Sequence, residues 1–278
     1  MTNLLITGAS GYIGTATKDY LNGSGINVIG VDFDKTNNEI NLLDFTKLKC
    51  FIYENKIDAV LHLAAFKSIP DSKSNPTRYL HNNIASSLNI ISICEDFKIP
   101  LVNASTAAVY GKGNPYSESK LIVEKFLESS NLNYINLRYF NIGGLIAPPN
   151  SRQISNIFDI IRFKHLNNKK FIINGNDSMR NYTHIKDIAK FNAGRIEDVL
   201  SNGNRRSMDV YSTNTVSVEE IVLMYKDLGI MVDYEIDHAG ETRAHIVPSG
   251  EGLISDGLSM RDIIESEIKY GIVLDNRI

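Results

Sequence analysis

The chain has 278 residues, 43% hydrophobic and 22% charged, which is ordinary for a globular protein of one large or two modest domains. Lys and Arg total 29 against 32 Asp and Glu, and this net charge of −3 disfavours a dedicated surface for nucleic acid or a polybasic membrane anchor. The two cysteines, Cys50 and Cys94, are too few for a disulfide framework or a zinc site, and we expect both to be small buried hydrophobic residues.

The sequence also argues against a membrane or export segment. No stretch approaches the roughly 18 uncharged apolar residues that a membrane helix needs. A glycine follows already at position 8 and no basic segment precedes it, so no secretory signal is expected. We therefore expect a soluble cytoplasmic protein with no nucleic-acid, membrane or metal partner.

In the first half of the chain, short apolar runs alternate with amphipathic stretches, the pattern of βαβ units around a parallel sheet. The expected strands are Leu4–Thr7, Asn27–Asp32, Ala59–Ala65, Pro100–Ser105 and Tyr134–Tyr139. The expected helices are Tyr12–Leu21, Phe45–Glu54 behind an Asp44 cap, Thr77–Phe97 and Ser117–Ser129. This order predicts an α/β fold with a Rossmann-like, doubly wound parallel sheet.

The regular alternation of strand-like and helix-like segments ends after Tyr139. The segments Asn141–Gly144 and Ala147–Ser151 break regular structure, and the remainder mixes short strands and helices. We predict a Rossmann domain over residues 1–140, with some later segments returning to its sheet. Residues 141–278 are expected to form mainly a smaller α/β lobe.

Three glycines lie between the first expected strand and the first expected helix. Gly8 permits a tight turn, Gly11 lets the backbone approach a pyrophosphate, and Gly14 lets the helix pack closely on the strand. Phosphates would then bind the exposed N–H groups at the helix start, where the helix dipole is positive. Glycines alone also fit a plain turn.

An acidic residue strengthens the dinucleotide interpretation. Asp32 ends the second expected strand, 18 residues after Gly14, where a carboxylate can accept hydrogen bonds from both hydroxyls of an adenosine ribose. The same charge would repel a 2′-phosphate, so NAD is favoured over NADP. A simple strand-end cap is the alternative role for Asp32.

Tyr116 and Lys120 are spaced i and i+4, on one face of a helix. A free tyrosine has a pKa near 10, but a nearby ammonium and a positively charged nicotinamide both favour the phenolate. Lowering the pKa by about three units takes about 4 kcal/mol of differential stabilisation. Tyr116 would then remove a hydroxyl proton while hydride leaves the same carbon. Alone, this spacing also fits a solvated helix face.

Thr106 ends the strand that precedes Tyr116. Ligands of open α/β sheets bind outside the carboxyl ends of the strands, and a hydroxyl there can hydrogen-bond the reacting oxygen. A capping hydroxyl without a catalytic part is the alternative.

These motifs together resemble the extended short-chain dehydrogenase/reductase superfamily, within it the NAD-dependent epimerase/dehydratase family, and most of all its nucleotide-sugar epimerase branch of the UDP-glucose 4-epimerase type. The resemblance runs from Leu4 to about Ala189. The matching segments are the glycine turn, Asp32, His62–Lys67, Asn82–Ile84, Ser105–Gly111, Tyr116–Lys120, Leu137–Asn141 and Arg180–His184.

The resemblance implies a residue set for each task. The cofactor contacts would be Gly8, Gly11, Tyr12, Ile13, Gly14, Asp32, Phe33, Asn41, Leu42, Leu63, Ala64, Ala65, Lys67, Asn83, Tyr116, Lys120 and Tyr139. The catalytic residues would be Thr106, Tyr116 and Lys120. The substrate contacts would be Lys67, Thr106, Tyr116, Phe140, Asn141, Asn156 and Arg180. Asn41 and Leu42 stand where the family often has an acidic residue on adenine, which implies a weaker contact there.

The implied substrate is a sugar on a nucleoside diphosphate, held by the smaller lobe. Arg180 matches an arginine that grips phosphate, although a surface arginine is the alternative. The implied reaction is reversible oxidation at sugar C4, turnover of the 4-keto sugar in the site, and return of hydride to its other face. Dehydratase relatives carry an Asp–Glu pair after the threonine, where this chain has Ala107 and Ala108, so no dehydratase activity is expected.

Two departures from the family concern the sugar. The connection Gly111–Pro115 is shorter than usual and lacks a loop that covers the sugar. The family's C-terminal element that binds the diphosphate is matched only weakly, by His238–Glu241 with Arg243 nearby. A relaxed or unusual sugar specificity is therefore expected.

Three classes of function stay open at this point. The chain is interpreted first as an NAD-dependent nucleotide-sugar 4-epimerase for carbohydrate and polysaccharide synthesis. It also fits an NAD(P)-dependent nucleotide-sugar reductase or dehydrogenase, which would consume added nicotinamide. A non-catalytic NAD-binding protein is a third reading. A homodimer through the helices Thr77–Phe97 and Ser117–Ser129 is implied by the resemblance alone.

Overall fold

The computed structural model describes residues 1–33, 40–111, 113–147, 156–174, 179–237, 246–248 and 252–273. The chain divides into two compact units. The first consists of Met1–Tyr139 and Ala189–Asp209, and the second of Phe140–Ile188 and Val210–Ile278. No helix in the described ranges is long and apolar enough to cross a membrane.

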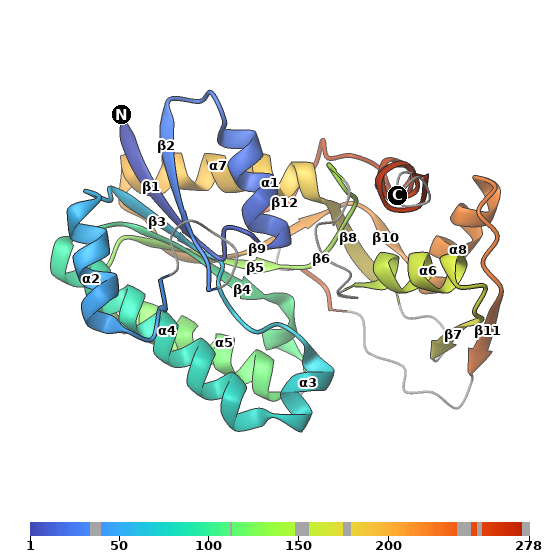
Figure 1. Ribbon diagram of the computed structural model, residues 1–278, viewed down its shortest axis with the longest axis horizontal. Helices are drawn as coiled ribbons and strands as arrows, with labels where there is room; N and C mark the ends of the chain where they lie inside the picture. Colours follow the sequence, from blue (N-terminus) through green and yellow to red (C-terminus); the bar gives the residue numbers. More distant parts are fainter. Residues whose placement is uncertain are drawn as a thin grey trace. The chain divides into compact units, whose positions relative to one another are not determined.

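The first unit contains the main sheet. Its strands are β1 (Thr2–Thr7), β2 (Ile26–Val31), β3 (Ala59–His62), β4 (Leu101–Thr106), β5 (Tyr134–Tyr139) and β9 (Arg205–Ser212). β9 runs on into the second unit, where Tyr211 and Ser212 pair with β12 (Leu253–Ile254). The seven-stranded sheet has the order β2-β1-β3-β4-β5-β9-β12 (Figure 1). Its neighbours from β2 to β5 are parallel, which confirms the predicted α/β fold class.

The strand order defines where this sheet can bind a ligand. From β1 the chain crosses to β2 on one side and later to β3 on the other, so the order reverses at β1. Open α/β sheets bind ligands at such a switch point, outside the carboxyl ends of the strands. The carboxyl ends here are Thr7, His62, Thr106 and Tyr139.

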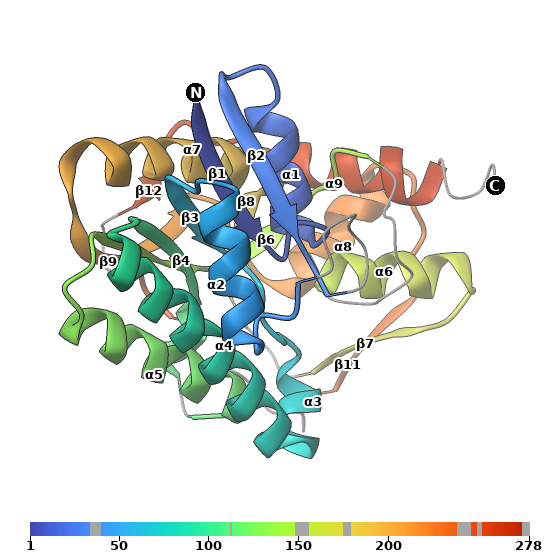
Figure 2. The same cartoon turned by 60° about the vertical axis from the view of Figure 1, so that its left-hand side comes forward.

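Helices cover both faces of the sheet (Figures 1 and 2). One face carries α1 (Tyr12–Leu21) and α7 (Ile185–Asn202), and the other carries α2 (Phe45–Glu54), α4 (Pro76–Phe97) and α5 (Pro115–Ser129). A short helix, α3 (Ile69–Ser74), precedes α4, and a 3-10 turn, η1 (Ala107–Tyr110), follows β4.

The core between α2, α4, α5 and the sheet is built from the buried faces of these helices. Leu48 and Ile52 of α2 and Ile90 of α4 are all fully buried in it. Cys94 is buried in the same cluster, as predicted, but the prediction for Cys50 is wrong because Cys50 is exposed on α2.

The predicted bounds of α1, α2 and β5 agree with the structure, and Asp44 caps α2 by accepting from the Lys47 N–H at 3.1 Å. β3 ends three residues earlier than predicted. The Leu63 N–H still donates to the Thr7 carbonyl at 3.2 Å, but the next N–H, that of Ala64, donates to the Thr7 side chain, so the chain leaves the sheet there.

The second unit has two small sheets. One is three-stranded in the order β10-β8-β6, made of β6 (Asn141–Gly143), β8 (Arg180–His184) and β10 (Thr215–Val216). The other pairs β7 (Phe171–Asn174) in parallel with β11 (Tyr234–Asp237). The remaining elements are α6 (Ile157–Leu166), α8 (Val218–Asp227), α9 (Met260–Glu267) and a π turn over Ile268–Val273.

A separate hydrophobic core holds this unit together. Phe158 and Ile161 of α6, Tyr225 of α8 and Ile263 of α9 are fully buried in it. The ring of Phe158 packs edge-on against Tyr182 of β8, with centroids 5.5 Å apart. This contact fixes the beginning of α6 against the three-stranded sheet.

Candidate active site

The glycine turn after β1 has a shape that only glycine allows. Gly8 has φ +69°, and a Cβ there would lie 2.9 Å from the Ala64 nitrogen. A Cβ at Gly14 would lie 2.3 Å from the Gly8 carbonyl oxygen. The packing of the turn therefore requires glycine at both positions. This agrees with the tight turn predicted at Gly8, whereas the close neighbours of Gly14 are Gly8 and Ala9 of the turn rather than the strand.

The start of α1 fits an anion. α1 begins at Tyr12 behind Gly11, a residue with no side chain to cap the helix, and α4 is another described helix without a side-chain hydrogen bond at its cap. The positive end of the α1 dipole lies at the glycine turn, where it would favour an anion. The Asp32 carboxylate lies against this turn and accepts from the Ser10 N–H at 3.0 Å and the Phe33 N–H at 2.9 Å. These residues fit a dinucleotide, although the same hydrogen bonds show that Asp32 also caps the turn.

Thr106 and Tyr116 are brought together at the carboxyl end of β4. A hydrogen bond from the Thr106 hydroxyl lowers the pKa of Tyr116, but burial has the larger effect and raises it above 10. Thr106 Oγ1 also accepts from the Ala108 N–H at 3.2 Å, so the predicted capping role is real and coexists with the contact to Tyr116. α5 begins at Pro115, with Asn114 as its cap, which places Tyr116 in the first helical turn.

Lys120 lies one turn beyond Tyr116, buried in the first unit. Its Nζ donates to the Ala104 carbonyl of β4 at 2.8 Å. Burial lowers the pKa of Lys120 to about 8, and the Glu124 carboxylate acts against that shift. The expected lowering of the Tyr116 pKa by this ammonium is not among the influences on Tyr116 in the protein alone.

A network of polar side chains around the buried Glu124 lies one turn beyond Lys120 on α5. The Glu124 side chain is 1% exposed and pairs with Arg138, whose Nη2 lies 2.6 Å away. Arg138 Nη1 donates to the Tyr110 hydroxyl at 2.6 Å, and that hydroxyl donates to Asp209 at 2.8 Å. Ser105 donates to Glu124 as well. This network was not predicted, although one signal was available: Glu124 is four residues after Lys120, on the same helix face.

The predicted cofactor residues after β3 lie in a segment held by Asn83. The Asn83 side chain accepts from the Phe66 N–H at 2.9 Å and donates to the Phe66 carbonyl at 3.0 Å. The segment over residues 63–67 leaves the sheet at its carboxyl end, and Lys67 is exposed. Asn83 thus shapes this segment, whatever else it contacts.

Other predicted cofactor residues are already engaged within the protein. The Tyr139 hydroxyl donates to Asn192 of α7 at 2.7 Å, and Asn192 donates to Thr17 of α1 at 3.1 Å. Leu42 packs against the core, and Phe33 is 73% exposed.

The predicted substrate residues of the second unit lie around β6, β8 and α6. Phe140 is buried and packs on Tyr211, with ring centroids 5.8 Å apart. Asn141 is exposed and donates to the Asn181 carbonyl at 3.0 Å. Asn156 caps α6 by accepting from the Asp159 N–H at 2.9 Å.

Arg180 begins β8 and is partly exposed, with Nη1 donating to the Met179 carbonyl at 2.7 Å. Its neighbour in sequence, Asn181, is the partner of Asn141, so these two predicted residues lie in adjacent strands. The C-terminal motif around His238–Arg243 lies outside the described residues.

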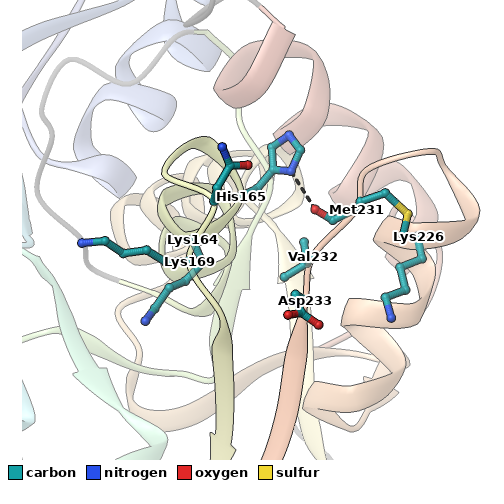
Figure 3. Close-up of a pocket in the computed structure, with 8 residues that line it drawn as sticks. Lys164, His165, Lys169, Lys226, Met231, Val232 and Asp233 are labelled. Carbon is teal, nitrogen blue, oxygen red and sulfur yellow. Dashed lines mark hydrogen bonds between the residues drawn. The ribbon is translucent and has the colours of Figure 1, made fainter.

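The second unit also has a cavity of about 360 Å³ (Figure 3). It is lined by Lys164, His165, Asn168, Lys169, Lys226, Met231, Val232 and Asp233. Its cations lie where α6 and α8 end, and such placement stabilises helix C-termini. The His165 Nδ1 donates to the Met231 carbonyl at 2.8 Å. None of the predicted site residues lines this cavity.

Comparison with protein families assigns the chain. The NAD dependent epimerase/dehydratase family matches residues 4–210, most of the chain. The protein belongs to this family. The match confirms the predicted resemblance, the class of enzyme and NAD as the cofactor.

The chain is also similar to individual relatives in sequence and to solved structures in fold. The UDP-glucose 4-epimerase of Halalkalibacterium halodurans is 28% identical over 262 residues, covering 79% of this chain and 78% of the relative. The UDP-glucose 4-epimerase of Stenotrophomonas maltophila, solved with bound NAD and formylated UDP-arabinopyranose, has a TM-score of 0.87 at 22% identity, with 100% of both chains covered. The UDP-N-acetylglucosamine 4-epimerase of Methanobrevibacter ruminantium has a TM-score of 0.77 at 25% identity, covering 96% of this chain and 98% of that one.

Proposed function

We propose that this protein is an NAD-dependent nucleotide-sugar 4-epimerase for UDP-linked sugars of the glucose or N-acetylglucosamine type. The observation that carries the proposal is the Thr106 hydroxyl placed to lower the pKa of Tyr116, with Lys120 one turn away on α5, in a chain with a dinucleotide turn. A protein that only binds NAD has no need of a phenol at that place.

The chemistry follows from these three side chains. The glycine turn with Gly8, Gly11 and Gly14 would hold NAD, which would supply the acceptor and the later donor of the hydride. Tyr116 takes the proton of the sugar C4 hydroxyl as the C4–H bond breaks, which leaves a 4-keto sugar. Thr106 donates a hydrogen bond to the reacting oxygen. In the reverse half-reaction Tyr116 returns the proton to the C4 oxygen, so the sum is inversion at C4 without net oxidation.

Ionisation of Tyr116 needs positive charge beside it. Burial raises the pKa of Tyr116 in the protein alone, and only Thr106 lowers it. The Lys120 ammonium and an oxidised nicotinamide are the cations that would act against burial. The phenolate is therefore expected only in the complex with the oxidised cofactor.

Sugar inversion requires that the sugar turns while the nucleotide stays fixed. We assign Asn141, Asn156 and Arg180 to the nucleotide diphosphate and Phe140 to the sugar. Arg180 suits a phosphate because its guanidinium donates two parallel hydrogen bonds. Binding energy from the nucleotide then holds the substrate through both half-reactions.

The side chains after Thr106 favour epimerisation over dehydration. Ala107 and Ala108 carry no acid or base, and both lie in η1 directly after β4. A single-step reductase is the second candidate. It consumes added nicotinamide in proportion to product, whereas the epimerase recycles its own.

The finer assignments belong to the same proposal. We assign cofactor binding mainly to residues 1–140 and substrate binding mainly to residues 141–278. We also propose that the protein works in the cytoplasm as a homodimer that pairs through α4 and α5. Light scattering of the purified protein that gives the mass of one chain would contradict the dimer.

The test uses the purified protein and its Tyr116→Phe variant. Small molecules released from the wild type are identified by mass spectrometry, and turnover is measured with UDP-glucose and UDP-N-acetylglucosamine. We expect released NAD and interconversion of C4 epimers. Tyr116→Phe should lower kcat by roughly 10²- to 10⁴-fold and leave the NAD content unchanged, because it removes only the proton acceptor.

Tyr53→Phe is the matched control, since Tyr53 is 71% exposed on α2. This variant should keep the activity of the wild type. Full activity of Tyr116→Phe would remove Tyr116 from its role. Stoichiometric consumption of added nicotinamide, or a 4-keto-6-deoxy product, would replace the epimerase by a reductase or a dehydratase.

A further inference from the structure

A chain of buried polar side chains crosses the first unit below the glycine turn. Thr7 of β1, His62 of β3, Ser87 and Asn83 of α4, and Ser119 of α5 are each no more than 2% exposed. They come from four different elements. Together they connect the segment after β3 with the first turn of α5.

From the Ala64 N–H to the Asn83 carbonyl, each group in this series of buried side chains donates its proton to the next one. The Ala64 N–H donates to Thr7 Oγ1 at 3.2 Å, and this hydroxyl lies 2.7 Å from His62 Nδ1. On the other side, His62 Nε2 lies 3.0 Å from the Ser87 hydroxyl, which donates to the Asn83 carbonyl at 2.7 Å. Because Ser87 gives its proton to that carbonyl, His62 Nε2 must be the donor and Nδ1 the acceptor.

The chain continues from Asn83 to the proposed proton acceptor. The Asn83 amide donates to the Ser119 hydroxyl at 3.1 Å, and Ser119 donates to the Tyr116 carbonyl at 2.7 Å. The same amide holds both backbone groups of Phe66. One continuous path therefore starts at the Ala64 N–H, beside Gly8, and ends at the backbone of Tyr116.

The central imidazole is neutral. Burial lowers the pKa of His62 to about 3, and the charge that acts on it is that of Lys120, which lowers the pKa further. An apolar side chain would be the cheaper filling for such a site, because each buried polar group must recover its lost hydration in hydrogen bonds. Both nitrogens of His62 have a hydrogen-bonding partner, Thr7 of β1 and Ser87 of α4. The imidazole therefore fixes the distance between β1 and α4 and their relative orientation at this place.

We infer that His62 is a positioning residue with two separable ends, Nδ1 fixing the cofactor-binding turn through Thr7 and Nε2 fixing Tyr116 through Ser87, Asn83 and Ser119. The inference rests on the proposed function for its kinetic part. It assigns a task to a side chain that touches neither the substrate nor the reacting atoms. Neither the family resemblance nor the proposed chemistry requires it.

Two variants separate the ends, because each keeps one polar position of the ring. His62→Asn keeps an acceptor near Nδ1 for Thr7 and loses the donor to Ser87. We expect it to retain NAD as the wild type does and to lower kcat by roughly ten- to a hundredfold at unchanged KM, as for a misplaced reacting group. Ser87→Ala should give the same result, and the double variant should lose no more than either alone.

His62→Gln keeps a donor near Nε2 for Ser87 and loses the acceptor for Thr7. We expect it to bind NAD roughly tenfold more weakly, in proportion to one lost buried hydrogen bond, and to recover the kcat of the wild type when NAD is added to saturation. Thr7→Val should behave in the same way. Asn136→Ala is the control. Asn136 is a buried amide of β5 that accepts from Asn103 at 2.7 Å, and it does not take part in the hydrogen-bonded series through His62. It should lower Tm only.

A readout without turnover is the ¹⁵N spectrum of the His62 ring. We expect a neutral ring protonated on Nε2 from pH 8 down to pH 5, and protonation on Nδ1 would overturn the inference. The inference would also be overturned if both His62 variants lost NAD affinity, kcat and Tm together and to the same extent. His62 would then have a structural role only. If the wild type neither releases NAD nor interconverts epimers, the proposed function fails instead, and the ring spectrum still decides the geometry.

Discussion

Each compact unit buries one glutamate beside an arginine, and the two pairs differ in geometry. Glu124 in the first unit is 1% exposed and Glu267 in the second is 2% exposed. Arg138 contacts Glu124 through Nε at 3.1 and 3.0 Å and through Nη2 at 2.6 Å. Arg162 reaches Glu267 only through Nη1 at 3.5 Å and gives its short hydrogen bond, 2.7 Å, to Asp159.

The geometry of each pair goes with a shifted pKa. Burial raises the pKa of Glu267 to about 8, against the lowering effects of Arg162 and of the hydrogen bond from Gly144. In the first unit the hydrogen bonds with Glu124 raise the pKa of Arg138. In the second unit Arg162 stays 3.5 Å from the Glu267 carboxylate, so too few short donors offset the burial of Glu267, and its pKa rises.

The largest effect is expected for Glu124→Gln. This change leaves the half-buried Arg138 beside a neutral amide in place of a fully buried carboxylate, and breaking a buried pair from one side costs about 3 to 5 kcal/mol of unfolding free energy. Urea denaturation at pH 7 measures it. Glu128→Gln, an exposed position on the same helix, is the control and should change stability by less than about 0.5 kcal/mol. A loss below 1 kcal/mol for Glu124→Gln would show that the pair carries no special stability.

Glu267→Gln is expected to raise the free energy of unfolding, whereas Glu124→Gln lowers it. Because the pKa of Glu267 is raised from 4.5 to about 8, the folded protein binds more protons than the unfolded chain between these values and loses stability as the pH rises through that window. A glutamine cannot ionise. We therefore expect the variant to match the wild type near pH 4.5 and to be more stable by about 1 to 3 kcal/mol at pH 8.

Denaturation curves at these two pH values test the prediction for Glu267→Gln. Glu265→Gln is the matched control on α9, where an exposed pair with Arg261 at 2.7 Å contributes only about 0.3 to 0.5 kcal/mol. A variant less stable than the wild type at pH 8 would mean that Glu267 is ionised and well paired.

The contrast between the pairs also marks what a sequence can predict. Glu124 is four residues after Lys120, so their shared helix face is visible in the sequence. Its partner Arg138 comes from β5, and no local pattern connects the two. The same limit applies to His62, whose partners lie 55 and 25 residues away in the chain. Sequence reasoning identified the motifs that contain Arg138 and His62, but it identified neither Glu124 nor the contacts between these residues.

The fold shows the same division. α1 and α2 were predicted with their observed bounds because each has a clear start and a period of 3.6 residues. α3 was not predicted, since six residues with a proline carry no periodic signal. In the second unit the strands have two to five residues, too few to show alternation. There the sequence predicted a smaller α/β lobe but no element.

His62 adds to the two glutamates a buried titratable group that has no carboxylate beside it among the described residues and that burial keeps neutral. Its pKa falls from 6.5 to about 3 on folding, so the unfolded chain binds more protons in that interval and the contribution of His62 to stability is lost as the pH falls below 6.5. The loss is about 1.4 kcal/mol for each pH unit. His62→Asn removes this titration but leaves His184, whose pKa is lowered to about 4, in both proteins. The free energies of unfolding of the two proteins should therefore converge by about 1.2 kcal/mol between pH 6 and pH 5, slightly below the full slope because the unfolded imidazole is still partly neutral at pH 6. A difference that stays constant over this range would mean that the ring is already charged in the folded protein, and both ends of the buried chain would then need another arrangement of protons.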